Sequence, residues 1–545
     1  MAKINIFALG GQDENGKNSL VIETSKDIYV VNAGLKVPIN NLNGIDGIIP
    51  DFQHLIDNKE KIRGIFITHS HDEVFAALPW LIMDLPGITI YASKYTAQII
   101  EDRVSKYKLG HNDYKIEVIS DSQKIGEDNI KSFSVANSIP GSLAYNFQTE
   151  DGDVVVMGSN TIEDLGPFGH TDLEKIKSES NDILALLLDS RIANYKGHSS
   201  EKKSIIPTIK SFFDKAGAKE RIIIGAYDEE VYTIQEVLEL AKKSGRPVVS
   251  YGRAFDALYS KLREQHKIDI PEFEDYKKAN KLDNAVVLVT GTWARLYQRF
   301  VRIANESDVF LKFRENDNII MISPPINGME VIYADSMDEV AKKSPNILDV
   351  SDKDYYKLRS ASEDIKQIIS TLKPKYFLPT NGLYRYLVVA TKLAIEVGVT
   401  QDRNVILQNG KIAIFENKEL ISQKTNIKSY GDVIIDGFGV GDVSFEVIRE
   451  RQTLATGGLI SIAMQLDRRT KKPISEMSIQ VLGLVTKPNL KEVQELVHSV
   501  VLQKFEEAKR FDYREIQNQI RKRARKVIQR RYDKEPLVVV TFYEV

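Results

Sequence analysis

Cysteine is absent from all 545 residues of the sequence, which excludes disulfide bonds and thiolate metal sites. An excess of charge of one sign is also missing, because 74 lysines and arginines against 76 acidic residues give a formal net charge of −2. Any contact with nucleic acid must therefore come from local patches. The sequence lacks the pattern of a signal peptide and any apolar run of membrane-spanning length, so we expect a soluble, cytoplasmic protein.

Patterns that would define several other catalytic classes are missing as well. The sequence has no GxGxxG that opens a helix, no Walker sequence, no Gly-x-Ser-x-Gly elbow and no internal repeat. Its 545 residues, of which 42% are hydrophobic, exceed what a single core usually organises. We therefore expect two or three domains, each with a core of its own.

The most informative stretch lies where a strand turns into a helix. Residues 65–68 read as a buried strand, and a helix-like apolar run begins a few residues later. Between them, His69 and His71 at i, i+2 can point at one position, and Asp72 with Glu73 can point at a second, as a two-metal hydrolase requires. The alternative is that the two acids cap the following helix and the histidines are ordinary polar residues at a strand end.

This stretch resembles the HxHxDH motif of metallo-β-lactamase-fold hydrolases, and the chain as a whole resembles the ribonuclease J family, their bacterial β-CASP nuclease branch. Supporting stretches follow in the family's order at residues 9–11 and 14–18, 137–140, 188–190 and 200–201, 245–246 and 251–253, and 373–379. The resemblance implies 5′-to-3′ exonuclease and endonuclease activity in messenger RNA decay and ribosomal RNA maturation. It also implies a zinc or manganese pair as cofactor.

The sequence departs from the family's motifs at most of the implied metal ligands. His69 and His71 are kept, and Glu73 stands at the aspartate position, so the resemblance implies a vestigial metal site with Glu73 as a candidate third ligand. Four further ligand positions are lost, at Val74, Asn137, Ser159 and Asn381. The supporting aspartate before residues 33–34 is replaced by Asn32. We therefore assign no catalytic residue and expect no stoichiometric binding of a metal pair.

These substitutions make the chain similar to the second, catalytically degenerate paralogue within the ribonuclease J family. The leading hypothesis is an RNA decay and processing subunit with little or no hydrolytic activity of its own. It would act in a complex with an active paralogue, as a homo- or hetero-oligomer. One alternative is a weakly active, atypical metal-dependent ribonuclease in which Glu73 and solvent complete one metal. A second alternative is a free-standing RNA-binding scaffold.

The patterning of apolar residues supports the domain organisation that the resemblance implies. Early alternation of apolar and polar positions predicts a β-meander, and the following strands and helices predict a sheet-on-sheet core with outer helices. The implied fold is a metallo-β-lactamase αβ/βα sandwich with an inserted parallel α/β domain of the β-CASP type and a small C-terminal β-α-β-α-β domain. The predicted boundaries are 1–198 and 359–425 for the two parts of the sandwich, 199–358 for the insertion, 426–450 for a linker and 451–545 for the C-terminal domain.

Two segments are candidates for contact with RNA. The family's substrate-binding loop corresponds to Tyr355, Tyr356, Lys357, Leu358 and Arg359, and the Arg359 fork could hold a phosphate, although such an arginine is more often a surface charge or an ion-pair partner. The last predicted helix could bind RNA phosphates or an acidic partner, or could simply be a solvated face. It carries Arg521, Lys522, Arg523, Arg525, Lys526, Arg530 and Arg531 with no acid between them.

Overall fold

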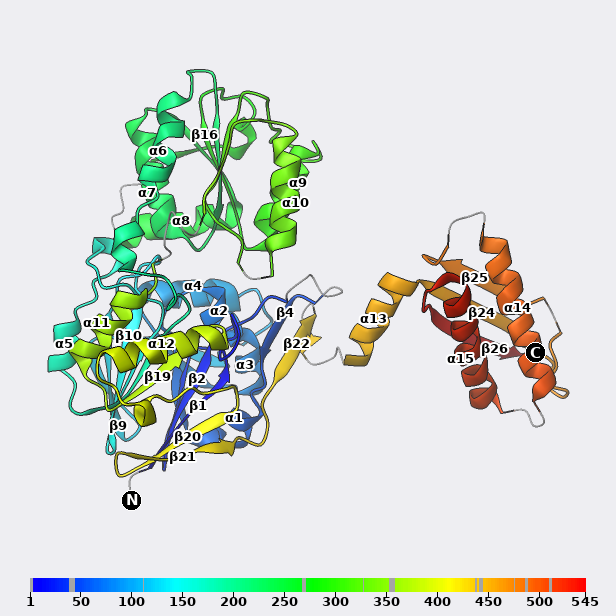
Figure 1. Ribbon diagram of the computed structural model, residues 1–545, viewed down its shortest axis with the longest axis horizontal. Helices are drawn as coiled ribbons and strands as arrows, with labels where there is room; N and C mark the ends of the chain where they lie inside the picture. The colour runs from blue at the N-terminus through cyan, green and yellow to red at the C-terminus, as the bar shows by residue number, and fades with distance from the viewer. Residues whose placement is uncertain are drawn as a thin grey trace. The chain divides into compact units, whose positions relative to one another are not determined.

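Two compact units make up the computed structural model of this chain (Figure 1). The first comprises Met1–Asn40 and Gly47–Val433, and the second comprises Asn41–Asp46 and Ile434–Val545. The structure describes residues 3–38, 45–110, 112–266, 271–326, 328–351, 358–436, 439–440, 445–474, 476–485, 489–508 and 512–545.

Two facing sheets form the sandwich of the first unit. The eight-stranded sheet has the order β21-β20-β1-β2-β3-β5-β6-β7, and the six-stranded sheet has the order β19-β12-β11-β10-β9-β8. The strands of the first sheet are β1 (Lys3–Gly10), β2 (Ser19–Thr24), β3 (Ile28–Val31), β5 (Ile62–Phe66), β6 (Ile88–Ala92), β7 (Tyr114–Val118), β20 (Lys411–Glu416) and β21 (Glu419–Asn426). Those of the second are β8 (Ser122–Ile125), β9 (Asp128–Ser134), β10 (Leu143–Thr149), β11 (Gly152–Met157), β12 (Ile183–Asp189) and β19 (Tyr376–Thr380).

Aromatic side chains fill the space between the two sheets. Phe66 of the first sheet meets Tyr145 and Phe147 of the second edge to face, with ring centroids 5.5 and 5.1 Å apart. All three side chains are fully buried, and burial of each such side chain contributes about 1.5–3 kcal/mol. The second sheet's outer face packs against α5 (Leu173–Ser178), α11 (Ser362–Leu372) and α12 (Tyr384–Glu396). The predicted sandwich with outer helices is therefore confirmed.

A third sheet, which is wholly parallel, is inserted in the sequence between β12 and β19. Its order is β15-β14-β16-β13-β17-β18. The strands are β13 (Ile222–Tyr227), β14 (Val248–Tyr251), β15 (Phe273–Glu274), β16 (Val286–Gly291), β17 (Asn318–Met321) and β18 (Ile347–Asp349). One face is covered by α6 (Ile206–Lys215), α7 (Val231–Lys243) and α8 (Arg253–His266), and the other by α9 (Ala294–Ala304) and α10 (Glu330–Ala341) (Figure 1). This is the inserted parallel α/β domain that the resemblance implied.

The second unit is a small two-layer domain whose element order differs from the prediction. It contains α13 (Phe445–Gly457), β24 (Leu459–Leu466), β25 (Ser478–Leu482), α14 (Leu490–Glu507), α15 (Tyr513–Tyr532) and β26 (Leu537–Glu544). The expected β-α-β-α-β order is wrong, because β24 and β25 pair antiparallel and need no helix between them. β26 lies parallel to β24, and the helix pair α14–α15 makes that crossover and covers one face of the sheet.

Shorter elements complete the described chain. They are β4 (Gly47–Pro50), α1 (Gln53–Asp57), α2 (Asp72–Phe75), α3 (Leu78–Asp84), α4 (Lys94–Val104), β22 (Asp432–Asp436), β23 (Gly439–Val440) and five 3₁₀ turns (Lys59–Lys61, Gly166–Phe168, Ser199–Lys202, Tyr276–Lys278 and Gln401–Arg403). The segment 426–450, predicted as a linker, thus contains an antiparallel pair of strands and the first turns of α13. The other predicted boundaries stay predictions. Every helix in the described ranges falls short of the length or apolarity that a membrane span requires.

Candidate functional site

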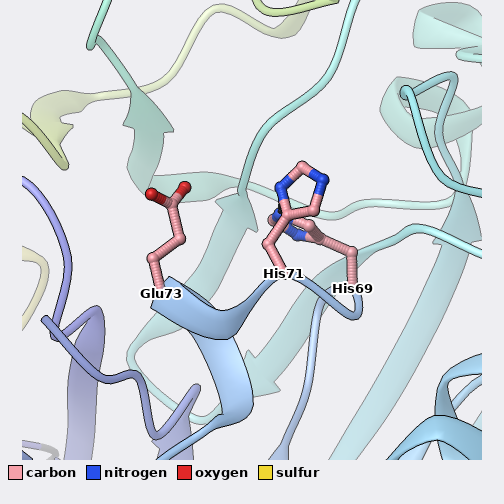
Figure 2. Close-up of side chains that lie close together, drawn as sticks. All are labelled: His69, His71 and Glu73. Carbon is pink, nitrogen blue, oxygen red and sulfur yellow. Dashed lines mark hydrogen bonds between the residues drawn. The ribbon is translucent and has the colours of Figure 1, made fainter. Parts of the chain in front are cut away.

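The three residues that the sequence singled out as metal ligands lie together just beyond the carboxyl end of β5 (Figure 2). His69 and His71 occupy the loop after the strand, and Glu73 lies in the first turn of α2. All three are buried, with 2%, 7% and 8% of their surface exposed. One candidate ligand atom from each lies within 4.8 Å of those of the other two. The chain passes from a buried parallel strand into a helix here, so three polar side chains converge at the edge of an apolar sheet.

A chain of hydrogen bonds uses the ring nitrogens of both histidines. The Thr68 hydroxyl donates to Asn32 Oδ1 at 3.1 Å, so its oxygen is left to accept from His69 Nδ1 at 2.9 Å. His69 Nε2 then accepts from His71 Nδ1 at 3.1 Å, and His71 Nε2 lies 3.3 Å from the Ser138 hydroxyl. Each imidazole is therefore placed as a neutral ring with one donor and one acceptor.

Burial and positive neighbours keep both rings neutral. The pKa of His71 is lowered to about 3, chiefly by burial; Glu73 opposes this shift, and the guanidinium groups of Arg359 and Arg191 add to it. The pKa of His69 also falls well below its usual range because of burial, with His71 and Arg359 acting in the same direction. Two neutral imidazoles are the protonation state that metal binding requires, and they are compatible with the hydrogen bond between the two rings.

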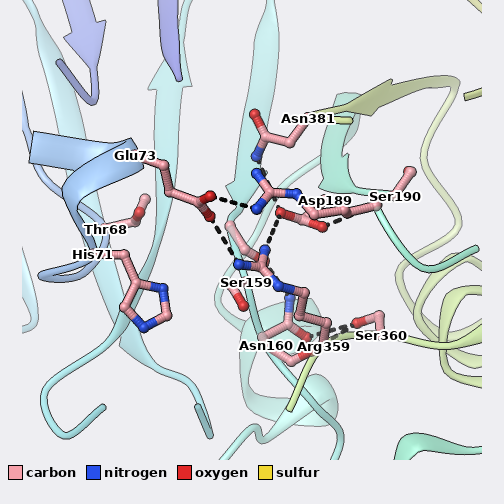
Figure 3. A network of polar contacts seen from close by, with 12 residues as sticks. Thr68, His71, Glu73, Ser159, Asn160, Asp189, Ser190, Arg359, Ser360 and Asn381 are labelled. Atoms are coloured by element: carbon pink, nitrogen blue, oxygen red, sulfur yellow. Dashed lines mark hydrogen bonds and ion pairs between the residues drawn. The ribbon is translucent and has the colours of Figure 1, made fainter. Parts of the chain in front are cut away.

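The Glu73 carboxylate is held by two arginines, of which Figure 3 labels Arg359. Oε1 accepts from Arg359 Nη2 at 2.8 Å, and Oε2 accepts from Arg191 Nη1. The other nitrogen of the Arg359 fork, Nη1, donates to Asp189 Oδ2 at 3.1 Å. Asn381 Nδ2 lies 3.3 Å from the same Asp189 oxygen. Two guanidinium groups and two carboxylates thus form one chain of ion pairs, Arg191–Glu73–Arg359–Asp189, whose formal charges cancel.

This network fixes the charge of the acid. Burial alone would raise the pKa of Glu73, but the guanidinium groups of Arg191 and Arg359 lower it well below its usual range. Burial likewise disfavours the charged form of Arg359, and the carboxylates of Glu73 and Asp189 outweigh it and raise the pKa of that guanidinium. Both partners are therefore fully ionised near neutral pH.

The positions where the sequence indicated lost ligands carry short polar or apolar side chains. Val74 is completely buried in α2, and Asn137 uses its Oδ1 to accept from the Ser138 backbone N–H at 2.6 Å. The Ser159 hydroxyl is 3.5 Å from the carbonyl oxygen of Leu358. Nothing at these positions supplies an imidazole or a carboxylate.

The predicted substrate-binding segment is described only in part. Tyr355, Tyr356 and Lys357 lie outside the described residues. Leu358 is buried and belongs to the core cluster that α6, α7 and α8 form with the inserted sheet. Arg359 is 7% exposed and is an ion-pair partner, which was the alternative to the phosphate role. The phosphate role of Arg359 itself stays a prediction.

The donor set of the site can be compared with the needs of one or two metal ions. The 3.1 Å between His69 Nε2 and His71 Nδ1 is close to the roughly 3.3 Å that two nitrogens adopt on one tetrahedral zinc. Both oxygens of Glu73 are already paired with guanidinium groups. A second ion would have to use Asn137, Ser159 and Asn381, which are weak donors. The residues fit part of one ion's ligand set and do not fit a pair.

A cavity of about 380 Å³ opens beside this network. His71, Arg191 and Arg359 line it from the sandwich, and Tyr227 and Trp293 line it from the carboxyl ends of β13 and β16 in the inserted domain. The Trp293 backbone has φ 46°, a conformation that side chains rarely adopt and that is typical of binding sites. The cavity has the aromatic and polar lining of a ligand cleft.

Sequence reasoning missed two members of the network. Asp189 appeared only as part of a supporting stretch, and Arg191 was not identified at all. The nearest available signal was the position of Arg191 directly after residues 188–190, at the carboxyl end of a predicted buried strand. The pairing of Arg359 with Glu73 joins residues 286 positions apart and leaves no local pattern.

The sandwich, the inserted parallel domain and the histidine loop at the carboxyl end of β5 define a metallo-β-lactamase-fold protein of the β-CASP type. Two family models match the chain, one described as the β-CASP domain of ribonuclease J, over residues 219–340, and one as the ribonuclease J C-terminal domain, over residues 446–545. Both models describe domains of the ribonuclease J family, which the chain resembles in its inserted domain and in its C-terminal domain.

Similar proteins span nearly the whole chain. Ribonuclease J2 of Bacillus subtilis is 28% identical over 558 aligned positions, which cover 99% of both chains. A Mycoplasma genitalium protein named "Uncharacterized protein MG423" is 27% identical and covers 89% of this chain and 87% of its own. A crystal structure of a protein of unknown function from Enterococcus faecalis superposes with a TM-score of 0.52 at 13% identity. It covers 76% of this chain and 100% of its own, which supports the fold alone.

Proposed function

We propose that this chain is a ribonuclease J-type subunit with little or no hydrolytic activity of its own. In this proposal it serves messenger RNA decay and ribosomal RNA maturation in the cytoplasm, in complex with an active paralogue. The observation that carries the proposal is the state of Glu73, whose two carboxylate oxygens are both paired with arginines. The names of its relatives support the family-level part of the proposal.

The chemistry of phosphodiester hydrolysis supports the loss of activity. Two bound cations would generate hydroxide and clamp the scissile phosphate in a two-metal site. A bridging carboxylate would be needed to hold two such cations close together, and Ser159 stands at that position. Two neutral histidines alone do not supply the field that lowers the pKa of a bound water. We therefore expect no stoichiometric zinc or manganese pair.

One observation favours a second candidate, a weakly active ribonuclease that uses a single ion. The facing nitrogens of His69 and His71 are spaced almost as one ion would hold them. Glu73 would have to release at least one arginine before it could act as the third ligand. This candidate therefore requires a rearrangement of the arginine network, whereas the subunit proposal requires none.

A nuclease assay on the full chain, alone and mixed with an active paralogue from the same organism, tests the proposal. With single-stranded RNA and Mn²⁺, we expect no cleavage by the chain alone and a changed rate or product pattern in the mixture. The double variant His69→Ala/His71→Ala should behave like the unmodified chain in both arms. Cleavage by the chain alone that falls about a hundredfold in the double variant would establish the single-ion enzyme instead.

Co-purification from native cytoplasm separates the subunit from the free-standing scaffold. The subunit proposal expects the active paralogue to be recovered with the tagged chain after ribonuclease treatment. Recovery of RNA without any nuclease partner would support the scaffold and overturn the proposal.

RNA contact is assigned within this proposal to the exposed face of α15. Lys522, Arg525, Lys526 and Arg530 are exposed, and among the described residues none of the four has an acidic partner within ion-pair distance. Arg531 differs because it pairs with Glu492 at 2.8 Å. The spacing of three and four residues places these cations on one side of the helix, where a phosphate backbone would meet several together.

A further inference from the structure

The arginine network at the site has the charge and the connectivity of a metal centre. Arg359 is 7% exposed, Glu73 is 8% exposed and Asp189 is 2% exposed, so the charges interact with little screening by water. Two guanidinium groups carry the same total charge as one divalent cation. Two carboxylates come within hydrogen-bond distance of them, which balances that charge.

The network also joins separate parts of the fold, as a metal ion with several ligands would. Glu73 comes from α2, which follows β5 of the eight-stranded sheet, whereas Asp189 ends β12 of the six-stranded sheet. Arg359 lies where the chain returns from the inserted domain, and its planar fork reaches both acids, at 2.8 and 3.1 Å. A guanidinium fork suits this task because its donors point in fixed directions at two carboxylates.

The same arrangement disfavours the binding of a divalent cation from solution at Glu73. An ion that approached Glu73 would meet two guanidinium groups already in contact with its carboxylate, and like charges repel strongly in a buried site. Removal of either arginine without a replacement would instead leave a buried carboxylate short of a partner. The site therefore needs positive charge, and the protein itself provides it.

We propose that Arg359, assisted by Arg191, is a built-in replacement for the metal ions of this fold, which holds Glu73 and Asp189 together and keeps divalent cations out. The inference concerns the same site as the proposed function. It rests on the proposed function in one respect, that the site has no hydrolytic role. It predicts that the ability to bind a divalent cation is latent and is blocked mainly by the Arg359 side chain, with Arg191 contributing.

The test is the variant Arg359→Met, which removes the charge and keeps most of the side-chain length. Mn²⁺ binding is measured by calorimetry on the full chain, together with the shift of the melting temperature on addition of Mn²⁺. We expect the variant to bind about one Mn²⁺ per chain at least about tenfold more tightly than the unmodified chain does. We also expect Mn²⁺ to restore much of the melting temperature that the substitution costs, because the ion replaces the missing charge.

Two further variants identify the ligands. In Glu73→Gln/Arg359→Met the carboxylate is gone, so the gain in Mn²⁺ affinity should disappear. The matched control is Arg63→Met, which removes an arginine that pairs with the buried Asp27 at 2.5 Å, at the opposite end of β5. This control should lose stability without gaining Mn²⁺ affinity.

Several outcomes would overturn the inference. One is stoichiometric Mn²⁺ binding by the unmodified chain with the affinity of Arg359→Met, and another is a folded Arg359→Met that gains no affinity. If Arg359→Met does not fold without metal, Mn²⁺ in the purification buffers should recover folded protein, and failure of that rescue also counts against the inference. The nuclease assay on the unmodified chain is independent, so failure of the proposed function and failure of this inference are distinguishable.

Discussion

At the scale of single residues, the neutral state of His71 makes stability depend on pH. Its pKa is about 3 in the folded chain and about 6.5 when unfolded, so between these values the unfolded state binds more protons. The stability contribution is fully present above the unfolded pKa and is lost as the pH falls below it. The slope for one such group reaches about 1.4 kcal/mol per pH unit.

The variant His71→Gln cannot titrate and should therefore flatten the pH dependence. Denaturant unfolding between pH 8 and 5 should give a free energy of unfolding that falls less steeply with acidification in the variant than in the unmodified chain. His170→Gln, at an exposed histidine, is the matched control and should leave the slope unchanged. Equal slopes for all three proteins would mean that His71 does not stay neutral in the folded chain.

Individual residues also show how far the sequence could predict the site. The convergence of His69, His71 and Glu73 followed from their position between a buried strand and a helix, because that local order fixes where the side chains lie. The partners of Glu73 could not be predicted in this way. Arg191 and Arg359 reach it across 118 and 286 positions, and ordinary patterning carries no information on such pairings.

At the scale of elements, periodicity predicted the helices and strands well but not their pairing. The C-terminal domain was expected over 451–545, where β24, β25, α14, α15 and β26 lie, yet their order was predicted as alternating. Two strands in succession can form an antiparallel pair without a crossover, and only the pairing of Ile460 with Val481 reveals that choice. Register and pairing depend on contacts between segments, which a single sequence does not display.

Helix α15 gives a prediction at the same scale. Replacement of Lys522, Lys526 and Arg530 by glutamine should weaken binding of single-stranded RNA uniformly across sequences. It should also reduce the slope of log affinity against log salt by about 0.7 for each phosphate that the helix no longer neutralises. Filter binding or fluorescence anisotropy at several salt concentrations measures both quantities.

The matched control removes three charges elsewhere in the same unit. Arg468, Arg469 and Lys472 are exposed in the turn between β24 and β25, and their replacement by glutamine changes the net charge equally. An equal loss of affinity in both triple variants would show that net charge, and not the α15 face, governs RNA binding.

At the scale of the whole molecule, the open face of the C-terminal sheet predicts assembly. Opposite the helices, Leu482, Val539 and Tyr543 are 60%, 39% and 58% exposed. Exposed apolar side chains that gather on one sheet face are typical of surfaces that another chain covers. We expect this face to contribute to association with an active paralogue and with a second copy of this chain.

Removal of the C-terminal part of the second unit, Ile434–Val545, tests that expectation. A chain that ends at Val433 keeps the sandwich and inserted-domain cores, so it should stay folded. Gel filtration with light scattering should show weaker association for the truncated chain, alone and mixed with the active paralogue. The full-length variant Leu482→Lys/Val539→Lys should weaken association in the same direction, and unchanged masses in both proteins would refute the assignment.

The long separation between Arg359 and its acids also has a consequence for the order in which the protein folds. Arg359 meets Asp189 across 170 positions and Glu73 across 286, and the inserted domain lies between the acids and the arginine in sequence. Closing such large loops is slow, so the insertion should fold before these ion pairs form. The ion pairs would then be absent from the folding transition state. Their loss should therefore raise the unfolding rate and leave the folding rate nearly unchanged. In stopped-flow experiments, Arg359→Met should unfold faster than the unmodified chain while refolding at nearly the same rate.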